Sequence, residues 1–192
     1  MKKIFAILTF LCAACMTIHA ERVYVGAEQT KLYLPLLKGK RVALLSNHTG
    51  IVIQGKDTIH TLDLLLKHGV EVTAIFSPEH GFRGTAREGE HVASSVDAKT
   101  GIPILSLYDG KSQRPSKEAM QTFDILITDI QDVGLRFYTY YVTMYRLMNA
   151  CASEDKQFMV FDRPNPNGFY VDGPILDMKH KSGVGALPIP VV

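Results

Sequence analysis

The chain has 192 residues, of which 21 are Lys or Arg, 19 are Asp or Glu, and 46% are hydrophobic. This composition excludes long disorder, which requires low hydrophobicity and a high net charge. Lys2 and Lys3 are the only charged residues among the first twenty, and the basic and acidic residues of the remainder balance. A neutral chain of about 170 residues predicts one globular domain and carries no electrostatic footprint for nucleic acid or an anionic membrane.

The first twenty residues have the layout of a secretory signal peptide. Lys2 and Lys3 form a positive start, residues 4–16 are apolar, and Ala20 is a small residue placed before Glu21. The apolar run is too short to cross a membrane, so we expect cleavage after Ala20 and export to the periplasm or the cell exterior. No other segment of the sequence is long and apolar enough to span a membrane.

The cysteines agree with export. Cys12 and Cys15 lie in the signal segment, which leaves Cys151 alone and excludes an intramolecular disulfide. Cys15 follows two alanines as in a lipoprotein signal, but Cys12 stands where such signals carry Leu, Val or Ile, which disfavours lipidation. Cys151 falls in a helical pattern and is interpreted as a buried structural thiol.

Apolar runs rich in β-formers alternate with helical patterns along the rest of the chain. The predicted strands cover residues 41–45, 70–76, 102–107, 124–130 and 157–161, and the predicted helices cover residues 57–68, 116–123 and 138–153. Asp57 or Thr58 would cap the first helix, and Gly69 would end it. Residues 81–101 are interpreted as a loop or lid with a short hairpin. The alternation predicts an α/β fold, an open sheet of about five mostly parallel strands with helices on both faces.

The end of the chain is irregular. After Pro164 it is rich in Gly and Pro, and residues 188–192 form an extended apolar run without a closing element. We interpret this pattern as that of a fragment of a longer protein.

Polar clusters follow the predicted strands. They comprise Ser46-Asn47-His48-Thr49-Gly50, Ser77-Pro78-Glu79-His80-Gly81-Phe82-Arg83-Gly84, the segment from Asp129 to Tyr138, and Asp162-Arg163-Pro164-Asn165. The carboxyl ends of parallel strands share one edge of a sheet, so these clusters are expected to converge there. Turn chemistry alone would supply Gly, Pro, Asn and Asp, but not Glu-His, Arg-Phe-Tyr and Asp-Arg together. We therefore predict a functional site at this edge.

Several kinds of site are excluded by their missing motifs. The sequence has no Gly-x-Gly-x-x-Gly after the first strand, no phosphate-binding Gly-x-x-x-x-Gly-Lys-Ser/Thr and no Gly-x-Ser-x-Gly elbow. These absences disfavour a dinucleotide site, a P-loop and a serine hydrolase of the elbow type. Carboxylates, histidines and arginines remain as the groups that carry chemistry.

Glu79 is the most informative of these groups. It leaves a buried strand between Pro78 and His80, and a partly desolvated Glu has a raised pKa and acts as a general acid. The alternative is a Glu bonded to backbone amides in a tight turn. Neighbouring residues of an extended chain point opposite ways, so His80 has a separate task, which is to orient Glu79, bind substrate or hold a metal. His48 either faces a ligand or stabilises its turn.

Asp129 and Asp132 are candidates for a second carboxylate, or they cap the following turn or pair with Arg136 or Arg163. The arginines either bind an anionic group bidentately or hold the loops by internal salt bridges; they are Arg83, Arg136 and Arg163. Tyr138 belongs to a group of aromatic residues that can stack on a sugar ring.

The four polar strings resemble those of the exo-β-N-acetylmuramidases, the NamZ- or YbbC-like glycoside hydrolases. Pro-Glu-His-Gly-Phe-Arg-Gly and Gln-Asp-Val-Gly-x-Arg-Phe-Tyr carry the resemblance, which extends over the chain after the signal segment. It implies a Rossmann-like catalytic domain over residues 21–192, followed by a second domain that is absent here. It also implies release of N-acetylmuramic acid from the non-reducing ends of peptidoglycan fragments, without cofactor or metal.

The resemblance assigns roles by position. Glu79 is the predicted general acid, and His80 and Asp129 are predicted beside it as catalytic residues. The predicted substrate-binding residues are Asn47, His48, Arg83, Asp132, Arg136, Tyr138, Asp162, Arg163 and Asn165. An arginine suits this substrate because muramic acid carries a lactyl carboxylate.

Two other classes of function stay open at this point. A metal-dependent hydrolase would use His48, His80, Asp129 and Asp132, although no one element carries a ligand pair such as His-x-x-x-His. A binding module would capture a muropeptide or sugar without turning it over.

Overall fold

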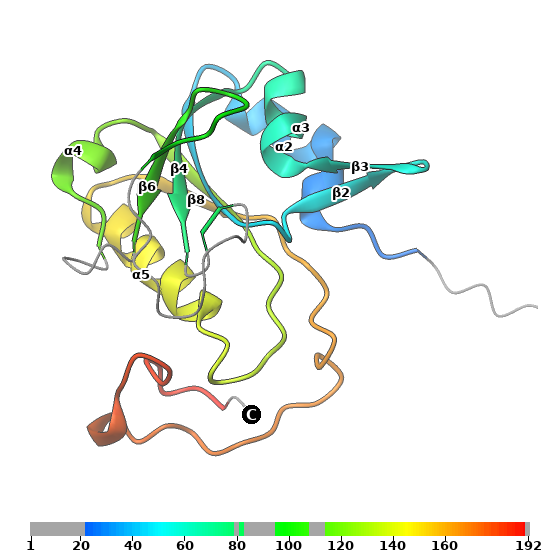
Figure 1. Cartoon of the computed structure of the whole chain (residues 1–192). Helices are drawn as coiled ribbons and strands as arrows, with labels where there is room; N and C mark the ends of the chain where they lie inside the picture. The colour runs from blue at the N-terminus through cyan, green and yellow to red at the C-terminus, as the bar shows by residue number, and fades with distance from the viewer. Residues whose placement is uncertain (1–21, 79–80, 83–94, 108–113, 191–192) are drawn as a thin grey trace, which may run out of the picture.

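The computed structural model describes residues 22–78, 81–82, 95–107 and 114–190, and its centre is a six-stranded sheet (Figure 1). The strand order is β5-β6-β4-β1-β7-β8. Five strands are parallel, and β5 pairs antiparallel to β6 at one edge. The strands are β1 (Arg41–Ser46), β4 (Glu71–Ser77), β5 (Ser95–Val96), β6 (Pro103–Ser106), β7 (Ile125–Asp129) and β8 (Gln157–Val160). The predicted α/β fold is confirmed, with β5 as a sixth strand.

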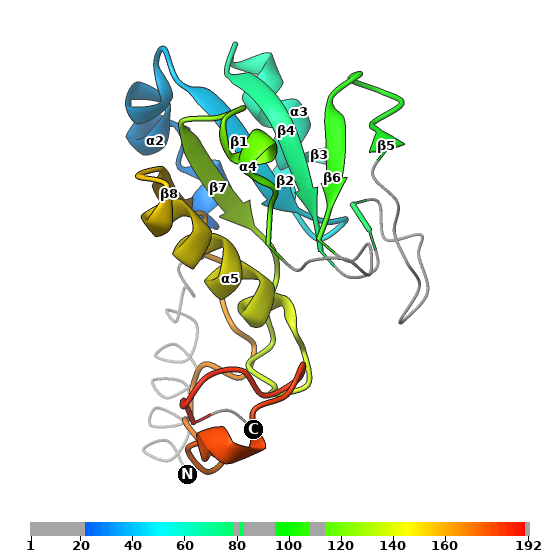
Figure 2. The ribbon, with the colours of Figure 1, turned by 90° about the vertical axis from the view of Figure 1, so that its left-hand side faces the viewer.

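Helices cover both faces of the sheet, as Figure 2 shows for α3 and α5. Helices α2 (Thr30–Leu37) and α3 (Thr61–Lys67) pack on one face, and α4 (Lys117–Met120) and α5 (Tyr140–Ser153) pack on the other. Alternate residues of β1 serve the two cores: Val42 and Leu44 face α2 and α3, whereas Ala43 and Leu45 face α4 and α5. Because both faces are covered, the middle parts of the inner strands β1, β4 and β7 are mostly apolar.

The segment predicted as one helix from Asp57 to His68 is instead a strand followed by a helix. Strand β3 (Asp57–His60) forms an antiparallel hairpin with β2 (Ile51–Gln54) around Gly55, and α3 begins only at Thr61. The cap is His60, whose Nδ1 accepts a hydrogen bond from the Leu62 amide at 3.1 Å. The prediction was wrong at this end because the hairpin's antiparallel pairing takes up residues 57–60, which continue the apolar pattern of the helix.

Other elements agree with the sequence or add to it. Ser116 caps α4 by accepting from the Ala119 amide, and α5 extends to Ser153 as predicted. The described part of residues 81–101 contains one strand, β5, which pairs with β6 outside that range, and residues 83–94 lie outside the described residues, so a hairpin within 81–101 stays a prediction. Helix α2 and the single turns η1 (Gly26–Glu28) and η2 (Met178–His180) were not predicted.

The segment after β8 is mostly irregular, with turns and bends and little helix or strand. It runs below the sheet in Figure 1 and leaves Phe169 and Val171 more than four-fifths exposed. An isolated bridge joins Ile175 to Pro190. None of the helices in the described ranges has the length and apolarity needed to cross a membrane.

Cys151 is fully buried on the inner side of α5, as predicted, and burial raises the pKa of its thiol to about 11. The thiolate is the reactive form, so the folded chain holds little of it at pH 8. In a chain starting at Glu21, where Cys151 is the single cysteine, we expect modification by a disulfide reagent to be more than about 100-fold slower in buffer than in concentrated urea. Comparable rates in the two solvents would contradict the burial.

The ion pair of Arg41 with Asp124 joins the starts of β1 and β7. The Arg41 guanidinium donates to both carboxylate oxygens, at 2.7 and 3.2 Å, and its hydrogen bonds lower the pKa of Asp124 to about 2. A lowered carboxyl pKa stabilises the fold above the unfolded value near 4, and this contribution disappears as the pH falls toward 2. We expect the stability difference between the natural chain and Asp124→Asn, measured by urea unfolding, to shrink from pH 5 to pH 2. A difference that does not change with pH would contradict this assignment.

Candidate active site

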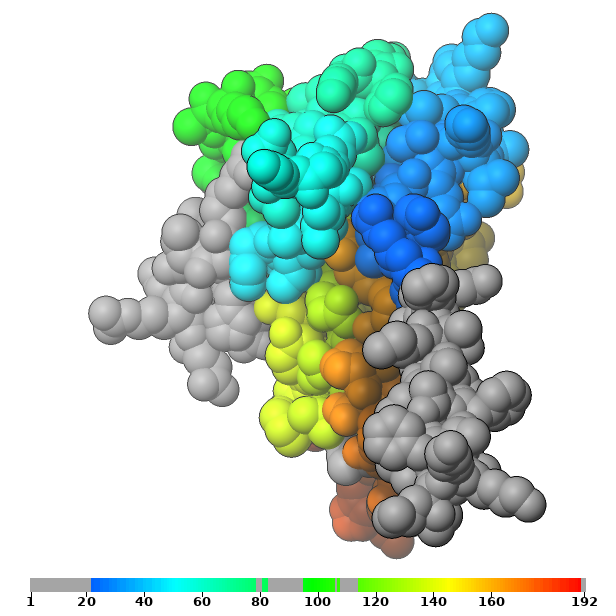
Figure 3. Space-filling model, turned by 90° about the vertical axis from the view of Figure 1, so that its right-hand side faces the viewer, coloured from blue at the N-terminus to red at the C-terminus, as the bar shows by residue number. Residues whose placement is uncertain are grey.

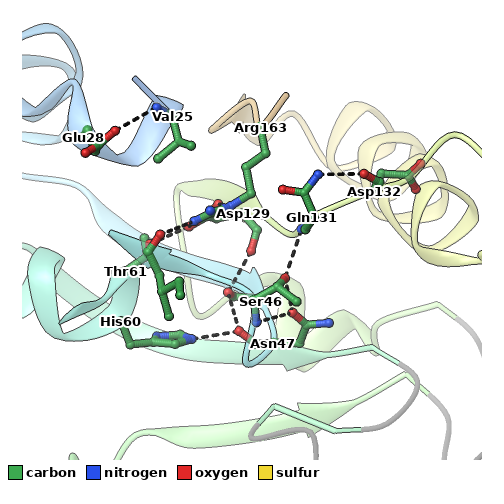
Figure 4. Close-up of polar contacts among 12 residues, drawn as sticks. Val25, Glu28, Ser46, Asn47, His60, Thr61, Asp129, Gln131, Asp132 and Arg163 are labelled. Carbon is green, nitrogen blue, oxygen red and sulfur yellow. Dashed lines mark hydrogen bonds and ion pairs between the residues drawn. The ribbon is translucent and has the colours of Figure 1, made fainter. Parts of the chain in front are cut away.

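The site is built where the order of the strands reverses. From β1 the chain goes first to β4 and β6 on one side, and later to β7 and β8 on the other side. The carboxyl ends of β1 and β7 therefore lie at a switch point, the place where open α/β sheets bind ligands. Figure 4 shows the loops after β1, β7 and β8 meeting there. In Figure 3 the loops after β7 and β8 lie side by side beneath the β2–β3 hairpin.

A buried ion pair occupies the centre of this edge. Asp129, the last residue of β7, has no exposed surface, and the side chain of Arg163 is only 6% exposed. Nε of Arg163 donates to Oδ1 of Asp129 at 2.5 Å, and one Nη donates to Oδ2 at 3.0 Å. The Thr61 hydroxyl also donates to Oδ2 of Asp129. The Nη of Arg163 that bonds this oxygen also donates to the Ile51 carbonyl at 3.0 Å. The pair thus joins β7, the loop after β8, the start of α3 and the hairpin.

The loop after β1 fixes a buried amide. Oδ1 of Asn47 accepts from the backbone amide of Thr49 at 2.9 Å and from its hydroxyl at 2.6 Å. The Asn47 carbonyl lies 2.9 Å from Nε2 of His60. Since Nδ1 of His60 accepts from the Leu62 amide, Nε2 carries the proton and donates to Asn47. These contacts set the orientation of the Asn47 side chain.

Nδ2 of Asn47 is the unused end of this amide. It is enclosed and makes no hydrogen bond with the described part of the chain. In Figure 4 it points away from His60. A buried donor without a partner costs free energy, of the order of 1–3 kcal/mol, and is rare outside functional sites. Asn47 therefore offers a fixed hydrogen-bond donor at the switch point.

Hydrogen bonds tie the three loops into one frame. The backbone amide of Gln131 donates to the Thr49 hydroxyl at 3.0 Å, and the side-chain nitrogen of Gln131 donates to the Pro164 carbonyl at 2.9 Å. Asn167 donates from Nδ2 to the Val133 carbonyl at 2.8 Å. Gly50 adds a close approach, because a Cβ at this position would overlap the Ser46 hydroxyl. These hydrogen bonds and the close approach at Gly50 restrict how the three loops can move relative to one another.

A half-open cavity of about 180 Å³ lies beside this frame, between β7, β8 and the start of α5. Asp132 contributes to its wall: Oδ1 accepts from the Gly134 amide at 2.7 Å, and Oδ2 is enclosed without a partner among the described residues. The cavity, called the β7–β8 hollow below, is lined by Thr128, Ile130, Asp132, Tyr140, Tyr141, Met144, Val160, Phe161, Asp162 and Arg163.

The structure brings several predicted site residues together at this edge. Asn47, Asp129 and Arg163 lie at the switch point, and Asp132 and Asp162 line the β7–β8 hollow. Asp129 and Arg163 form an internal salt bridge, which was one of the alternatives that the sequence analysis gave for them. Both oxygens of Asp129 and two nitrogens of Arg163 are engaged in it. This geometry favours positioning roles over the catalytic and substrate-binding roles predicted for them.

The other predicted residues lie around this centre. His48 is exposed. One Nη of Arg136 donates to the Pro174 carbonyl at 2.8 Å, and Tyr138 makes an edge contact with Tyr140. Asn165 is exposed and accepts from the Asn167 amide at 2.9 Å.

Glu79, His80 and Arg83 lie outside the described residues, so their predicted roles stay predictions. Two of their neighbours are placed, since the Gly81 amide donates to the Pro78 carbonyl and the buried ring of Phe82 meets His60 edge-on. Within the described ranges no group of three His, Cys, Asp or Glu side chains is arranged to hold a metal ion, but His80 is not among them.

Sequence reasoning missed Thr61, His60 and the role of Gln131. Thr61 lies 68 residues before Asp129, so its bond to the carboxylate has no local signal. Gln131 stands in one of the four strings, yet its bonds to two other loops depend on the tertiary structure.

Comparison with known proteins identifies the family to which the chain is similar. The family model "Exo-beta-N-acetylmuramidase NamZ, N-terminal" matches residues 42–192. Over 161 residues the chain is 46% identical to "Peptidoglycan beta-N-acetylmuramidase NamZ" of Bacillus subtilis (strain 168), covering 83% of this chain and 38% of the relative.

Two crystal structures of DUF1343 family proteins from Bacteroides fragilis NCTC 9343 are also similar. Both superpose with a TM-score of 0.76, at 59% and 36% identity. They cover 90% and 88% of this chain and 43% of each of those chains. The chain thus spans less than half the length of these relatives.

The buried Asp129–Arg163 ion pair predicts how substitutions at these two residues change the free energy of unfolding. Asp129→Leu leaves the Arg163 charge buried without its partner, a change that typically costs about 3–5 kcal/mol of unfolding free energy. Replacing both residues, Asp129→Leu with Arg163→Met, removes the two charges together and should cost clearly less than the sum of the single changes. Urea unfolding of Asp129→Leu, Arg163→Met and the double variant, followed by circular dichroism, measures this coupling. Additive losses would show that the pair is not a unit.

Proposed function

Because the chain belongs to the exo-β-N-acetylmuramidase NamZ family and matches its N-terminal model, we propose that it acts in an exo-acting glycoside hydrolase of peptidoglycan. The substrate would be a peptidoglycan fragment with N-acetylmuramic acid at its non-reducing end, and the product would be the released sugar. The single observation that carries this proposal is the 46% identity to a peptidoglycan β-N-acetylmuramidase over most of the chain.

The geometry of the edge supports a saccharide site. A fixed donor, Asn47 Nδ2, and the carboxylates of Asp132 and Asp162 lie at neighbouring strand ends. Sugars are bound by such hydrogen bonds combined with apolar and aromatic surface, which the β7–β8 hollow supplies through Tyr141 and Met144. The loops that carry these groups are tied together, so the site is organised before substrate arrives.

Glu79 is the general acid in this proposal. In the sequence it comes two residues after Ser77, the last residue of β4, and β4 is the neighbour of β1 in the sheet. A carboxyl group that is partly removed from water keeps its proton at neutral pH and can protonate the oxygen of the leaving group. Asp129 acts by holding the loops rather than by touching the sugar.

Export completes the proposal, because peptidoglycan lies outside the cytoplasmic membrane. The positive start at Lys2 and Lys3, the apolar residues 4–16 and the small residue Ala20 support removal of residues 1–20 during secretion.

The proposal is tested with a chromogenic β-N-acetylmuramide. We expect the chain starting at Glu21 to release the chromophore and Glu79→Gln to lower kcat by about 100-fold or more, as loss of a general acid does. Glu71→Gln is the matched control, since Glu71 is exposed at the opposite end of the same strand.

Two outcomes would contradict the proposal. Equal rates in Glu79→Gln and Glu71→Gln would remove Glu79 from the reaction. Saturable binding of the muramide without any product over long incubation would identify a binding module instead of an enzyme.

A further inference from the structure

The polar groups at the edge are distributed unevenly. Near β1 the unused group is a donor, Nδ2 of Asn47. In the β7–β8 hollow the polar groups without a partner are acceptors: Asp132 Oδ2 is enclosed and has no partner among the described residues, and Asp162 is an exposed residue of the wall. The edge therefore has a donor end and an acceptor end.

The hollow is unsuited to an anion. Arg163 is the one cation among the described residues that line it, and its guanidinium is turned toward Asp129 and the Ile51 carbonyl. Two carboxylates on the wall would repel a third carboxylate, such as the lactyl group of muramic acid. Hydroxyl groups, in contrast, donate charge-assisted hydrogen bonds to carboxylates.

The size and the remaining walls suit one sugar ring. The hollow of about 180 Å³ is too small for a disaccharide. Tyr141 stands at its wall, partly exposed, and its hydroxyl donates to the Val184 carbonyl at 3.3 Å. This bond fixes the ring, whose face can cover the apolar C–H side of a pyranose.

We propose that the β7–β8 hollow is the subsite for the neutral sugar on the leaving-group side of the scissile bond, an N-acetylglucosamine ring bound through its hydroxyls to Asp132 and Asp162. This inference rests on the proposed function. It gives the substrate a direction along the edge: the muramoyl ring lies toward the loop after β1 and its donor Asn47, and the next ring lies in the hollow.

Binding is measured first, because it does not depend on turnover. N-acetylglucosamine titrated into the ¹⁵N-labelled chain should shift the amide signals of Ile130 and Tyr141. The dissociation constant should rise about tenfold or more in Asp132→Asn, the loss expected for a charge-assisted hydrogen bond. Asp57→Asn, at an exposed site on β3, is the matched control and should bind as the natural chain does.

Charge selectivity is the second measurement. Free N-acetylmuramic acid should shift the signals of the hollow several-fold more weakly than N-acetylglucosamine. Tyr141→Phe keeps the ring and should bind the neutral sugar better than Tyr141→Ala. Equal binding of N-acetylglucosamine by Asp132→Asn and the control, or equal binding of the two sugars, would overturn the proposal.

Kinetics separate this inference from the proposed function. For Asp132→Asn, kcat/KM should fall about tenfold further on a muramoyl-glucosamine disaccharide than on a nitrophenyl muramide. Turnover with equal losses on both substrates would leave the glycosidase standing and overturn the subsite. N-acetylglucosamine binding that depends on Asp132, in a chain without turnover, would keep the subsite and overturn the glycosidase.

Discussion

The buried pair of Asp129 and Arg163 is the constraint on which the carboxyl edge depends. A carboxylate with no exposed surface is stable as an ion only when its oxygens are paired, and here Arg163 and Thr61 donate to them. The same guanidinium reaches the Ile51 carbonyl of the hairpin. The charge of one residue at the end of β7 therefore fixes the loop after β8, the start of α3 and the start of β2 relative to one another.

This frame explains why so few polar groups of the edge remain available. Thr49 and Gln131 use their groups to join the loops, and Arg163 is committed to Asp129. The described residues of the edge that keep such groups include a donor on Asn47 and acceptors on Asp132 and Asp162, which lie at different strand ends. Donors and acceptors that are held apart on tied loops favour one orientation of a ligand whose two ends carry different groups.

The features predicted correctly from the sequence are those that depend on short stretches of neighbouring residues. Continuous apolar runs located β1, β4 and β7, and the position of Cys151 on a helical face predicted its burial. The helix start at Thr61 was missed because the apolar pattern of residues 57–60 serves a hairpin and a helix equally. The partner of Asp129 could be narrowed only to two arginines, since an ion pair across 34 residues depends on how the strands are ordered.

The environment of Asp129 also bears on how a glycosidase reaction can proceed here. Both of its oxygens accept from Arg163, so it cannot attack a sugar carbon or deprotonate water without breaking the pair. Some glycosidases that act on N-acetylated sugars use the acetamido oxygen of the substrate as the nucleophile, and such a reaction needs a protein acid but no protein nucleophile. In the proposed reaction, with Glu79 as that acid, the enclosed and paired Asp129 would keep the edge rigid around the sugar ring and would take no part in bond making.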